Sequence, residues 1–179
     1  MPYGEFAVRG QMHGFTLVEV LVALFVLAVG IVGAGAAQLT AERTRQQSAL
    51  MSDAAWLAAS LAARMQVNPA ISSLPDGANP YLALDYDAAG GPPAATPGCY
   101  GSAACTPAQL AASDLHDIRE AVHARFPRGR ILVCRDGVPW DGAARRFRWD
   151  CDGDAAALPV VKLGWQGTGA APGYVGVIR

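Results

Sequence analysis

The sequence predicts an α+β protein in which a long N-terminal helix precedes a small head with a second helix and a roughly four-stranded antiparallel sheet. Three observations support this fold class. First, an apolar N-terminal segment is followed by apolar residues at helical spacing, in steps of three and four. Second, another set of apolar residues with this spacing lies in the middle of the chain. Third, short runs of β-forming residues separated by turn signals follow it.

The N-terminal apolar segment is long enough to cross a membrane. Residues 15–37 contain no charged residue except Glu19. At about 1.5 Å per residue, a helix of this length reaches roughly 35 Å, which spans a hydrocarbon core. A lone carboxylate in such a segment is costly and usually has a partner or a function. We therefore expect a transmembrane segment over 15–37, with Glu19 as its functional residue.

The helix is expected to continue beyond this segment. The neck over residues 38–47 is polar but contains no proline. Asn68-Pro69 ends the helix, because the residue before proline is pushed out of the α region. The predicted domains are therefore a helix over 15–68 and a head over 69–179. The buried face of the helix is predicted from apolar residues at steps of three and four, namely Leu50, Ala54, Leu57, Leu61 and Met65.

The head is expected to contain disulfides. All four cysteines follow residue 98, which suits an oxidising compartment. Four cysteines allow three connectivities, and we favour Cys99–Cys105 and Cys134–Cys151. The first two flank a short turn. The other two lie symmetrically about the 142/143 peptide bond, so a hairpin turning there would place them opposite each other. Zinc at Cys99 and Cys105 is the alternative, but neither C-x-x-C nor a histidine spacing supports it.

The middle of the chain predicts a connector followed by the second helix. Residues 69–105 are rich in proline, glycine, alanine and serine, and a loop of this length usually carries function or is pinned. Thr106, Pro107 and Gln109 then provide an N-cap, a proline at the first helical position and a capping box. The buried stripe of this helix is predicted to be Ala111, Leu115, Ile118, Val122 and Phe126.

The C-terminal part of the chain predicts the sheet. Four runs are rich in β-forming residues and are separated by turn signals. They cover 130–134, 146–151, 159–165 and 174–178.

Two groups of acidic and histidine residues have spacings that suit a metal ion, but a solvated surface explains both better. The acidic group fails the EF-hand pattern, because no glycine follows Asp154 and Val161 stands at the twelfth position. We therefore expect no metal and no cofactor. The two groups are His116, Glu120 and His123 on the second helix, and Asp150, Asp152 and Asp154 after a strand.

Composition and motifs argue against several function classes. Fourteen basic and 15 acidic residues give a formal net charge of −1, and no basic stripe favours nucleic acid. The chain has no G-x-S-x-G motif and no phosphate-binding glycine loop with lysine. We expect a structural subunit and not an enzyme.

The N-terminal residues also resemble a known processing signal. Gly14 followed by Phe15-Thr16-Leu17-Val18-Glu19-Val20-Leu21-Val22-Ala23-Leu24 resembles the class III signal of type IV pilins and type II secretion pseudopilins. The resemblance implies that a prepilin peptidase cuts between Gly14 and Phe15, removing residues 1–14 as a leader, and N-methylates Phe15. Translation from Met12 would leave a shorter leader. After the cut, the Phe15 amine of a neighbouring copy could pair with Glu19.

A second resemblance concerns the end of the helix. Ala63-Arg64-Met65-Gln66-Val67-Asn68-Pro69, followed by a small cysteine-containing head, is similar to PilV-type minor pilins, the type IV pilus modification proteins. This implies a subunit of the priming complex or pilus tip. Its partners would be other minor and major pilins, the prepilin peptidase, the inner-membrane assembly platform and a tip adhesin. It would be a single-pass inner-membrane protein with a periplasmic head, and later part of the fibre at the cell surface.

Two alternatives stay open. A minor pseudopilin of a type II secretion system would carry the same N-terminal motif. A secreted or anchored binding module, such as an adhesin with its ligand surface on 69–105, would instead use an ordinary signal peptide, for which Ala34-Gly35-Ala36 supplies a cleavage site. The length of the apolar run and the acidic Glu19 within it argue against such a signal peptide.

Overall fold

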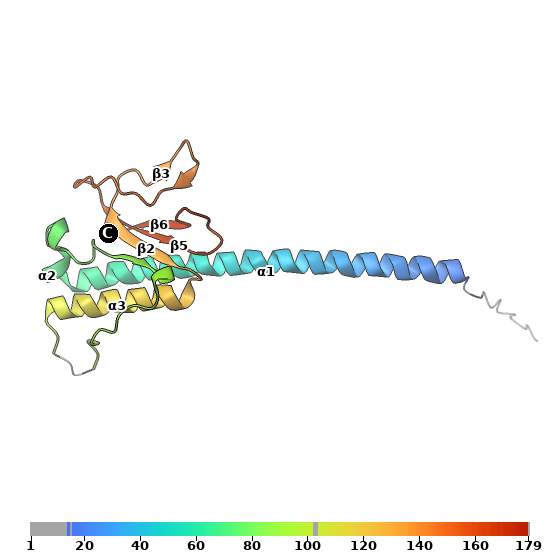
Figure 1. Cartoon of the computed structure of the whole chain (residues 1–179), viewed down its shortest axis with the longest axis horizontal. Coiled ribbons are helices and arrows are strands. Elements are labelled where there is room, and N and C mark those ends of the chain that lie inside the picture. Colours follow the sequence, from blue (N-terminus) through green and yellow to red (C-terminus); the bar gives the residue numbers. More distant parts are fainter. Residues whose placement is uncertain (1–13, 15, 102–103, 179) are drawn as a thin grey trace, which may run out of the picture. The chain divides into compact units, whose positions relative to one another are not determined.

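The computed structural model describes residues 14, 16–101 and 104–178 (Figure 1). The chain divides into two compact units, residues 1–46 and 47–179. Helix α1 (Leu17–Val67) begins in the first unit and ends in the second. Within the predicted range 15–68, α1 runs from Leu17 to Val67, and the predicted first residue, Phe15, lies outside the described residues. The helix stops at Val67 because Pro69 opens the short helix α2 (Pro69–Ser72).

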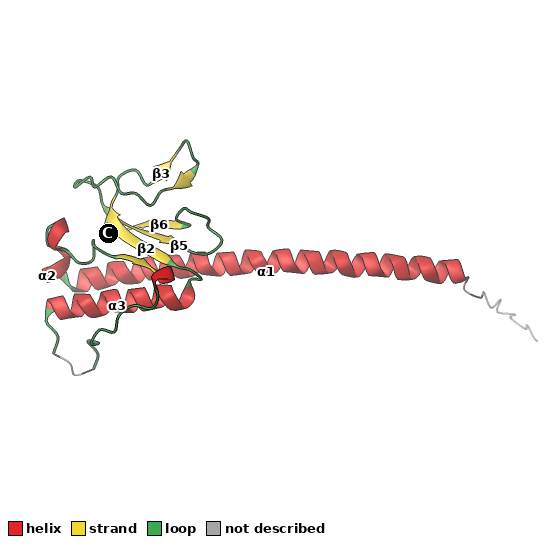
Figure 2. Cartoon of the chain, viewed as in Figure 1, coloured by secondary structure: helices red, strands yellow, loops and turns green. Residues whose placement is uncertain are grey.

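The remaining elements all lie in the second unit (Figure 2). Besides α1 and α2, the elements are η1 (Asp76–Ala78), β1 (Asp85–Asp87), η2 (Ala88–Gly90), α3 (Pro107–Arg125), β2 (Arg130–Arg135), β3 (Trp140–Asp141), β4 (Arg146–Phe147), β5 (Pro159–Gly164) and β6 (Tyr174–Val177).

The core of the second unit lies between two helices and one face of the sheet. The C-terminal part of α1 runs beside α3, and the sheet packs against them (Figure 1). Both predicted stripes are confirmed, since every member is buried except Leu50, which is partly buried and packs against the core. Burial of such a side chain stabilises the fold by about 1.5–3 kcal/mol. The sheet contributes Ile131, Val133, Val161 and Leu163.

The start of α3 follows the predicted capping box. The backbone N–H of Gln109 donates to the Thr106 hydroxyl oxygen at 3.3 Å, and the Gln109 side chain accepts the Thr106 N–H at 2.9 Å. Pro107 occupies the first helical position, where it has no intrahelical hydrogen bond to lose. The local sequence therefore determines where this helix begins.

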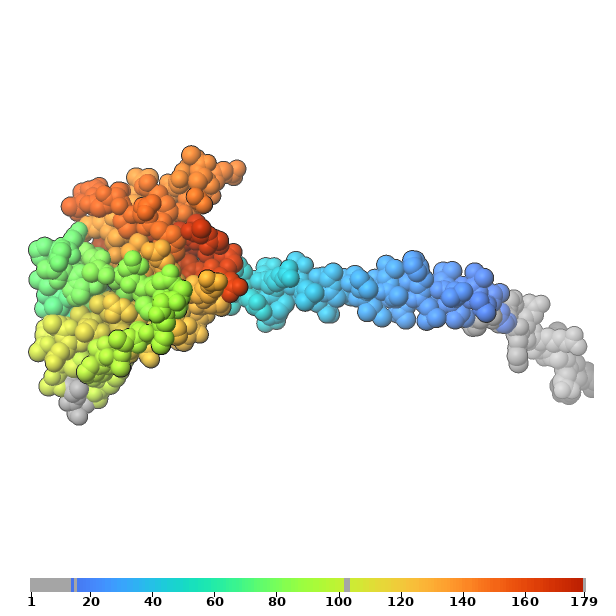
Figure 3. Space-filling model, viewed as in Figure 1, coloured from blue at the N-terminus to red at the C-terminus, as the bar shows by residue number. Residues whose placement is uncertain are grey.

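The sheet has four antiparallel strands in the order β1-β2-β5-β6, as the fold class predicted, but one strand assignment was wrong. The run 146–151 lies outside this sheet, and β1 from the connector pairs with β2 instead. In place of a sheet strand, residues 146–147 form β4, which pairs with β3 in a separate two-stranded ribbon. This ribbon projects from the second unit (Figure 3).

Side-chain pattern explains why β5, and not the 146–151 run, pairs with β2. A strand inside a sheet that is covered on both faces needs an almost continuous buried run. Strand β5 meets this requirement, because all its residues after Pro159 are buried. The run 146–151 has a charged residue at every second position, so one of its faces could not be buried. Those residues are Arg146, Arg148 and Asp150.

Two disulfides join Cys99 to Cys105 and Cys134 to Cys151. These are the pairs that we favoured, but the hairpin argument for the second pair was wrong. Cys134 lies opposite Val160 of β5, and Cys151 lies on the loop after the ribbon. The bond therefore ties that loop to the main sheet and does not cross a hairpin.

Removing the Cys134–Cys151 bond should destabilise the second unit more than removing the Cys99–Cys105 bond. The Cys134–Cys151 bond closes a loop with a sequence separation of 17, and the Cys99–Cys105 bond closes one with a separation of 6. Loop-closure entropy then predicts a loss of about 3 kcal/mol for Cys134→Ser/Cys151→Ser and about 2 kcal/mol for Cys99→Ser/Cys105→Ser. Denaturant unfolding of the full chain in micelles, followed by tryptophan fluorescence, measures both losses. A larger loss for the Cys99/Cys105 variant would contradict this order.

Candidate functional site

The first turn of α1 is organised by Thr16 and Glu19. The Thr16 carbonyl accepts the N–H groups of Glu19 and Val20 at 3.1 and 3.2 Å, and its hydroxyl accepts the Glu19 N–H at 3.3 Å. Thr16 is thus the N-cap of the helix. The T-x-x-E spacing of a capping box carries this signal, and our reading of the sequence missed it. A carboxylate in the first turn is also favoured by the helix dipole.

The Glu19 side chain is exposed and has no hydrogen bond or ion pair with any residue that the structure describes. It lies in an apolar helix surface. The most apolar 18-residue stretch of α1 has a mean hydropathy of 2.7, and no part of it is buried. Length and composition are therefore sufficient for α1 to cross a membrane. In such an environment, an unpaired carboxylate calls for a partner outside the chain.

The predicted cleavage and methylation sites are only partly described. Gly14 is exposed, and a Cβ placed on it would meet no atom within 4 Å. Phe15, predicted to be N-methylated, and residues 1–13 of the predicted leader lie outside the described residues.

Comparison with known families bears on this same segment. The model of the prokaryotic N-terminal methylation motif matches residues 9–35, which contain Gly14, Phe15 and Glu19. The chain carries a type IV pilin class III signal. No curated protein and no solved structure matches the chain. The signal indicates a type IV pilin-like or pseudopilin protein, and with the apolar α1 it fits a single-pass, membrane-anchored pilin.

In the second unit, a polar network joins the end of α1 to α3. Arg64 donates to the carboxylates of Asp114 and Asp117 at 2.6 and 2.9 Å. The Tyr81 hydroxyl donates to Asp114 at 2.8 Å, and Tyr100 donates to Asp117. Burial, and next the hydrogen bond to Asp114, raises the pKa of Tyr81 to about 12. Both tyrosines belong to the connector, which is thereby held against α3.

On the other face of the sheet, a buried ion pair holds the loop after the ribbon. Lys162 and Asp136 are both buried, with 2.5 Å between the ammonium nitrogen and a carboxylate oxygen. The ammonium also donates to the carbonyls of Arg148, Trp149 and Asp150 at 2.9, 3.3 and 2.7 Å. These contacts satisfy the charge that burial removes from water. No motif in the sequence singles out Lys162, because its partners come from separate segments.

The two groups that were considered as metal sites do not assemble. His116 lies 4.0 Å from Glu120, whereas the His123 ring faces the Tyr86 hydroxyl at 2.9 Å. Asp152 accepts the backbone N–H groups of Gly137 and Val138 at 2.9 and 3.2 Å. Among the described residues there is no cluster of three or more His, Cys, Asp or Glu side chains that could hold a metal.

Lys162→Met should destabilise the second unit by about 3–5 kcal/mol, because it leaves the Asp136 carboxylate buried without its cation. Adding Asp136→Asn should recover part of this loss, since the neutral amide removes the buried charge but the three carbonyls still lack a donor. Arg135→Met breaks the more exposed pair with Asp76 and should cost about 1 kcal/mol. Denaturant unfolding compares the variants. If Lys162→Met lowered the free energy of unfolding by less than Arg135→Met does, Lys162 would not be what holds the loop.

Proposed function

We propose that this chain is a PilV-type minor pilin, a structural subunit of the complex that initiates a type IV pilus or of the pilus tip. The observation that carries the proposal is the unpaired Glu19 carboxylate on an unburied apolar helix, within a class III signal. Residues 63–69, which contain the end of α1 and the start of α2, and the small disulfide-bonded head after them, support the assignment to the PilV type.

Maturation proceeds in this proposal by a cut between Gly14 and Phe15, with residues 1–14 removed and Phe15 N-methylated. Residues 15–37 of the 15–68 helix then span the inner membrane, and the head over 69–179 lies in the periplasm. During assembly the helix leaves the bilayer and packs among the helices of other minor and major pilins. The prepilin peptidase and the inner-membrane assembly platform are transient partners, and a tip adhesin is a partner in the finished fibre.

Glu19 has a specific role in this assembly. Its carboxylate receives the methylated amine of Phe15 from a neighbouring subunit, so that two charges in an apolar layer neutralise each other. A carboxylate at the centre of a membrane helix costs about 2.5–3.5 kcal/mol on insertion scales, whereas an opposite charge within a few ångströms favours its ionised form. Glu19 lies in the first turn of α1, so its pairing with the neighbour's Phe15 amine fixes the axial offset between the two helices. This offset is the register of the assembly.

Gly14→Val should block processing, because the peptidase must accommodate the side chain before the scissile bond. Gly30→Val is a matched control, since a Cβ at Gly30 also meets no atom within 4 Å but lies far along α1. Co-expression with a prepilin peptidase followed by gel mobility and N-terminal sequencing measures the cut. Processing of Gly14→Val at the wild-type level would refute the proposed site.

Glu19→Ala and Glu19→Gln should insert in the membrane but fail to assemble, because the neighbour's amine would enter the apolar layer without a counter-charge. Glu19→Asp, with a shorter reach, should recover only part of the activity. Glu42→Ala is the control, because Glu42 is an exposed carboxylate of the same helix that contacts only nearby side chains of that helix among the described residues, Gln46 at 3.3 Å and Arg45 at 3.7 Å. Incorporation into pili is measured in a strain that lacks the native copy.

The outcome also separates the candidate functions. Restored piliation by the wild-type gene supports the minor pilin, whereas restored protein secretion without pili would indicate a pseudopilin. Wild-type assembly by Glu19→Ala would contradict the pairing mechanism, and a mature chain that starts at Ala37 would contradict the pilin proposal as a whole.

A further inference from the structure

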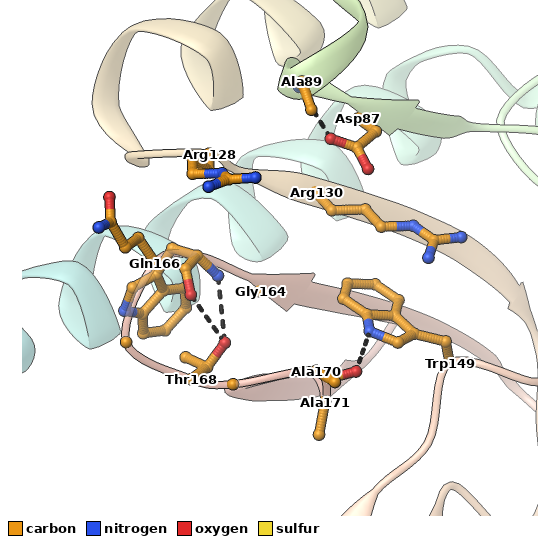
Figure 4. A pocket seen from close by; sticks show the side chains of 13 residues that line it. Asp87, Ala89, Arg128, Arg130, Trp149, Gly164, Gln166, Thr168, Ala170 and Ala171 are labelled. Carbon is orange, nitrogen blue, oxygen red and sulfur yellow. Dashed lines mark hydrogen bonds between the residues drawn. The ribbon is translucent and has the colours of Figure 1, made fainter.

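A cleft of about 370 Å³ opens on the second unit, and all its lining residues belong to that unit. Arg128 and Arg130 lie along one side of it, and the loop between β5 and β6, with Thr168 and Ala170, lies along the other (Figure 4). The Trp149 ring lies between Arg130 and this loop (Figure 4). The cleft is therefore a polar hollow with two guanidinium groups on one wall.

Arg130 is held in place but its donors are unused. Its guanidinium lies 4.5 Å from the centre of the Trp149 ring, and the Trp149 indole N–H donates to the Ala170 carbonyl at 3.1 Å. The closest carboxylate oxygen, on Asp85, is 3.6 Å away, beyond hydrogen-bond distance. The Nε of Arg130 is buried and has no hydrogen-bond partner among the described residues. The rest of the guanidinium is part-exposed, with 37% of the side chain accessible, so its outer N–H groups can donate to an acceptor in the cleft.

Arg128 adds a second cation, in an unfavourable backbone conformation, and unlike Arg130 it forms no ion pair with a described residue. Its φ is +53°, in the left-handed region, and no described residue pairs with its side chain. This conformation costs a non-glycine residue stability, and such strain at a cleft is a recognised sign of function. The one carboxylate in the lining, Asp87, already accepts the Ala89 N–H at 2.8 Å. The cleft therefore has an excess of positive charge.

We propose that this cleft binds an oxyanion carried by a small ligand, a phosphate or the carboxylate of a sugar acid. Guanidinium groups present parallel N–H donors that match the oxygens of carboxylate and phosphate. The cleft volume lies at the low end of small-molecule sites, which suits one sugar-sized unit. Bound anion would accept the exposed guanidinium N–H groups of Arg128 and Arg130 and would relieve the repulsion between the two arginines. The head then carries a recognition site that is separate from helix assembly.

The test titrates the full chain, in micelles of a non-ionic detergent, with inorganic phosphate and with glucuronate, and glucose is the neutral control. Fluorescence of Trp149 and Trp165, which line the cleft, and calorimetry report binding. We expect saturable binding of at least one anion and none of glucose, and the anion that binds identifies the oxyanion. Arg130→Gln should weaken binding about tenfold or more.

Arg128→Gly provides the sharper variant, because glycine adopts a positive φ without strain. It should weaken anion binding about tenfold or more while the melting temperature stays the same or rises, so lost binding cannot be ascribed to misfolding. Arg145→Gly is its matched control. Arg145 is also an exposed arginine with a positive φ of +51°, but it lies outside the cleft, so its loss should leave binding unchanged.

Absence of saturable binding by both anions would overturn the proposal. Equal weakening by Arg128→Gly and Arg145→Gly would also overturn it, since binding would then depend on surface charge in general and not on this cleft.

Discussion

Helix α1 has to satisfy two environments along one element, and the rest of the structure depends on that constraint. In the second unit it buries a narrow apolar stripe against the sheet and α3. In the first unit it carries apolar residues on all sides, and its large ones are exposed. A helix that is apolar all round needs an apolar solvent or other helices around it, whereas a striped helix needs only one partner surface. The first half therefore needs apolar surroundings from outside the chain, and the second half packs against the head.

Two cations lie where separate segments meet, Arg64 partly exposed and Lys162 fully buried. Arg64 joins α1 to α3 through two carboxylates, and Lys162 joins β5 to the loop after the ribbon. Each such group is satisfied by several acceptors, as burial of a cation requires. The head also relies on two disulfides, which suits a small unit whose connector is rich in glycine and proline. Glu19 contrasts with these groups, because its acceptor oxygens face outward without a partner among the described residues.

The Lys162 pair and the Cys134–Cys151 bond act on neighbouring parts of one segment. Lys162 binds the carbonyl of Trp149, and the disulfide holds Cys151 two residues later. Both therefore position the Trp149 ring, which contacts the Arg130 guanidinium in the cleft. A surface feature that is separate from assembly thus depends on core contacts of the head.

Local signals in the sequence determined both long helices of this protein and the motif that links it to pilins. The Asn68-Pro69 end of α1, the Thr106 cap of α3 and the two apolar stripes depend on residues within a few turns of one another, so periodicity and capping were sufficient to predict them. Only the tertiary structure decided the strand order, the place of Cys151 and the partners of Lys162 and Arg130. Segments that are far apart in the sequence compete to pair with the same strand. Here β1 occupies a position beside β2 in the sheet, whereas local β-propensity had predicted 146–151 as the fourth strand. Buried ion pairs and clefts likewise arise from residues that only folding brings together, which is why no spacing in the chain revealed them.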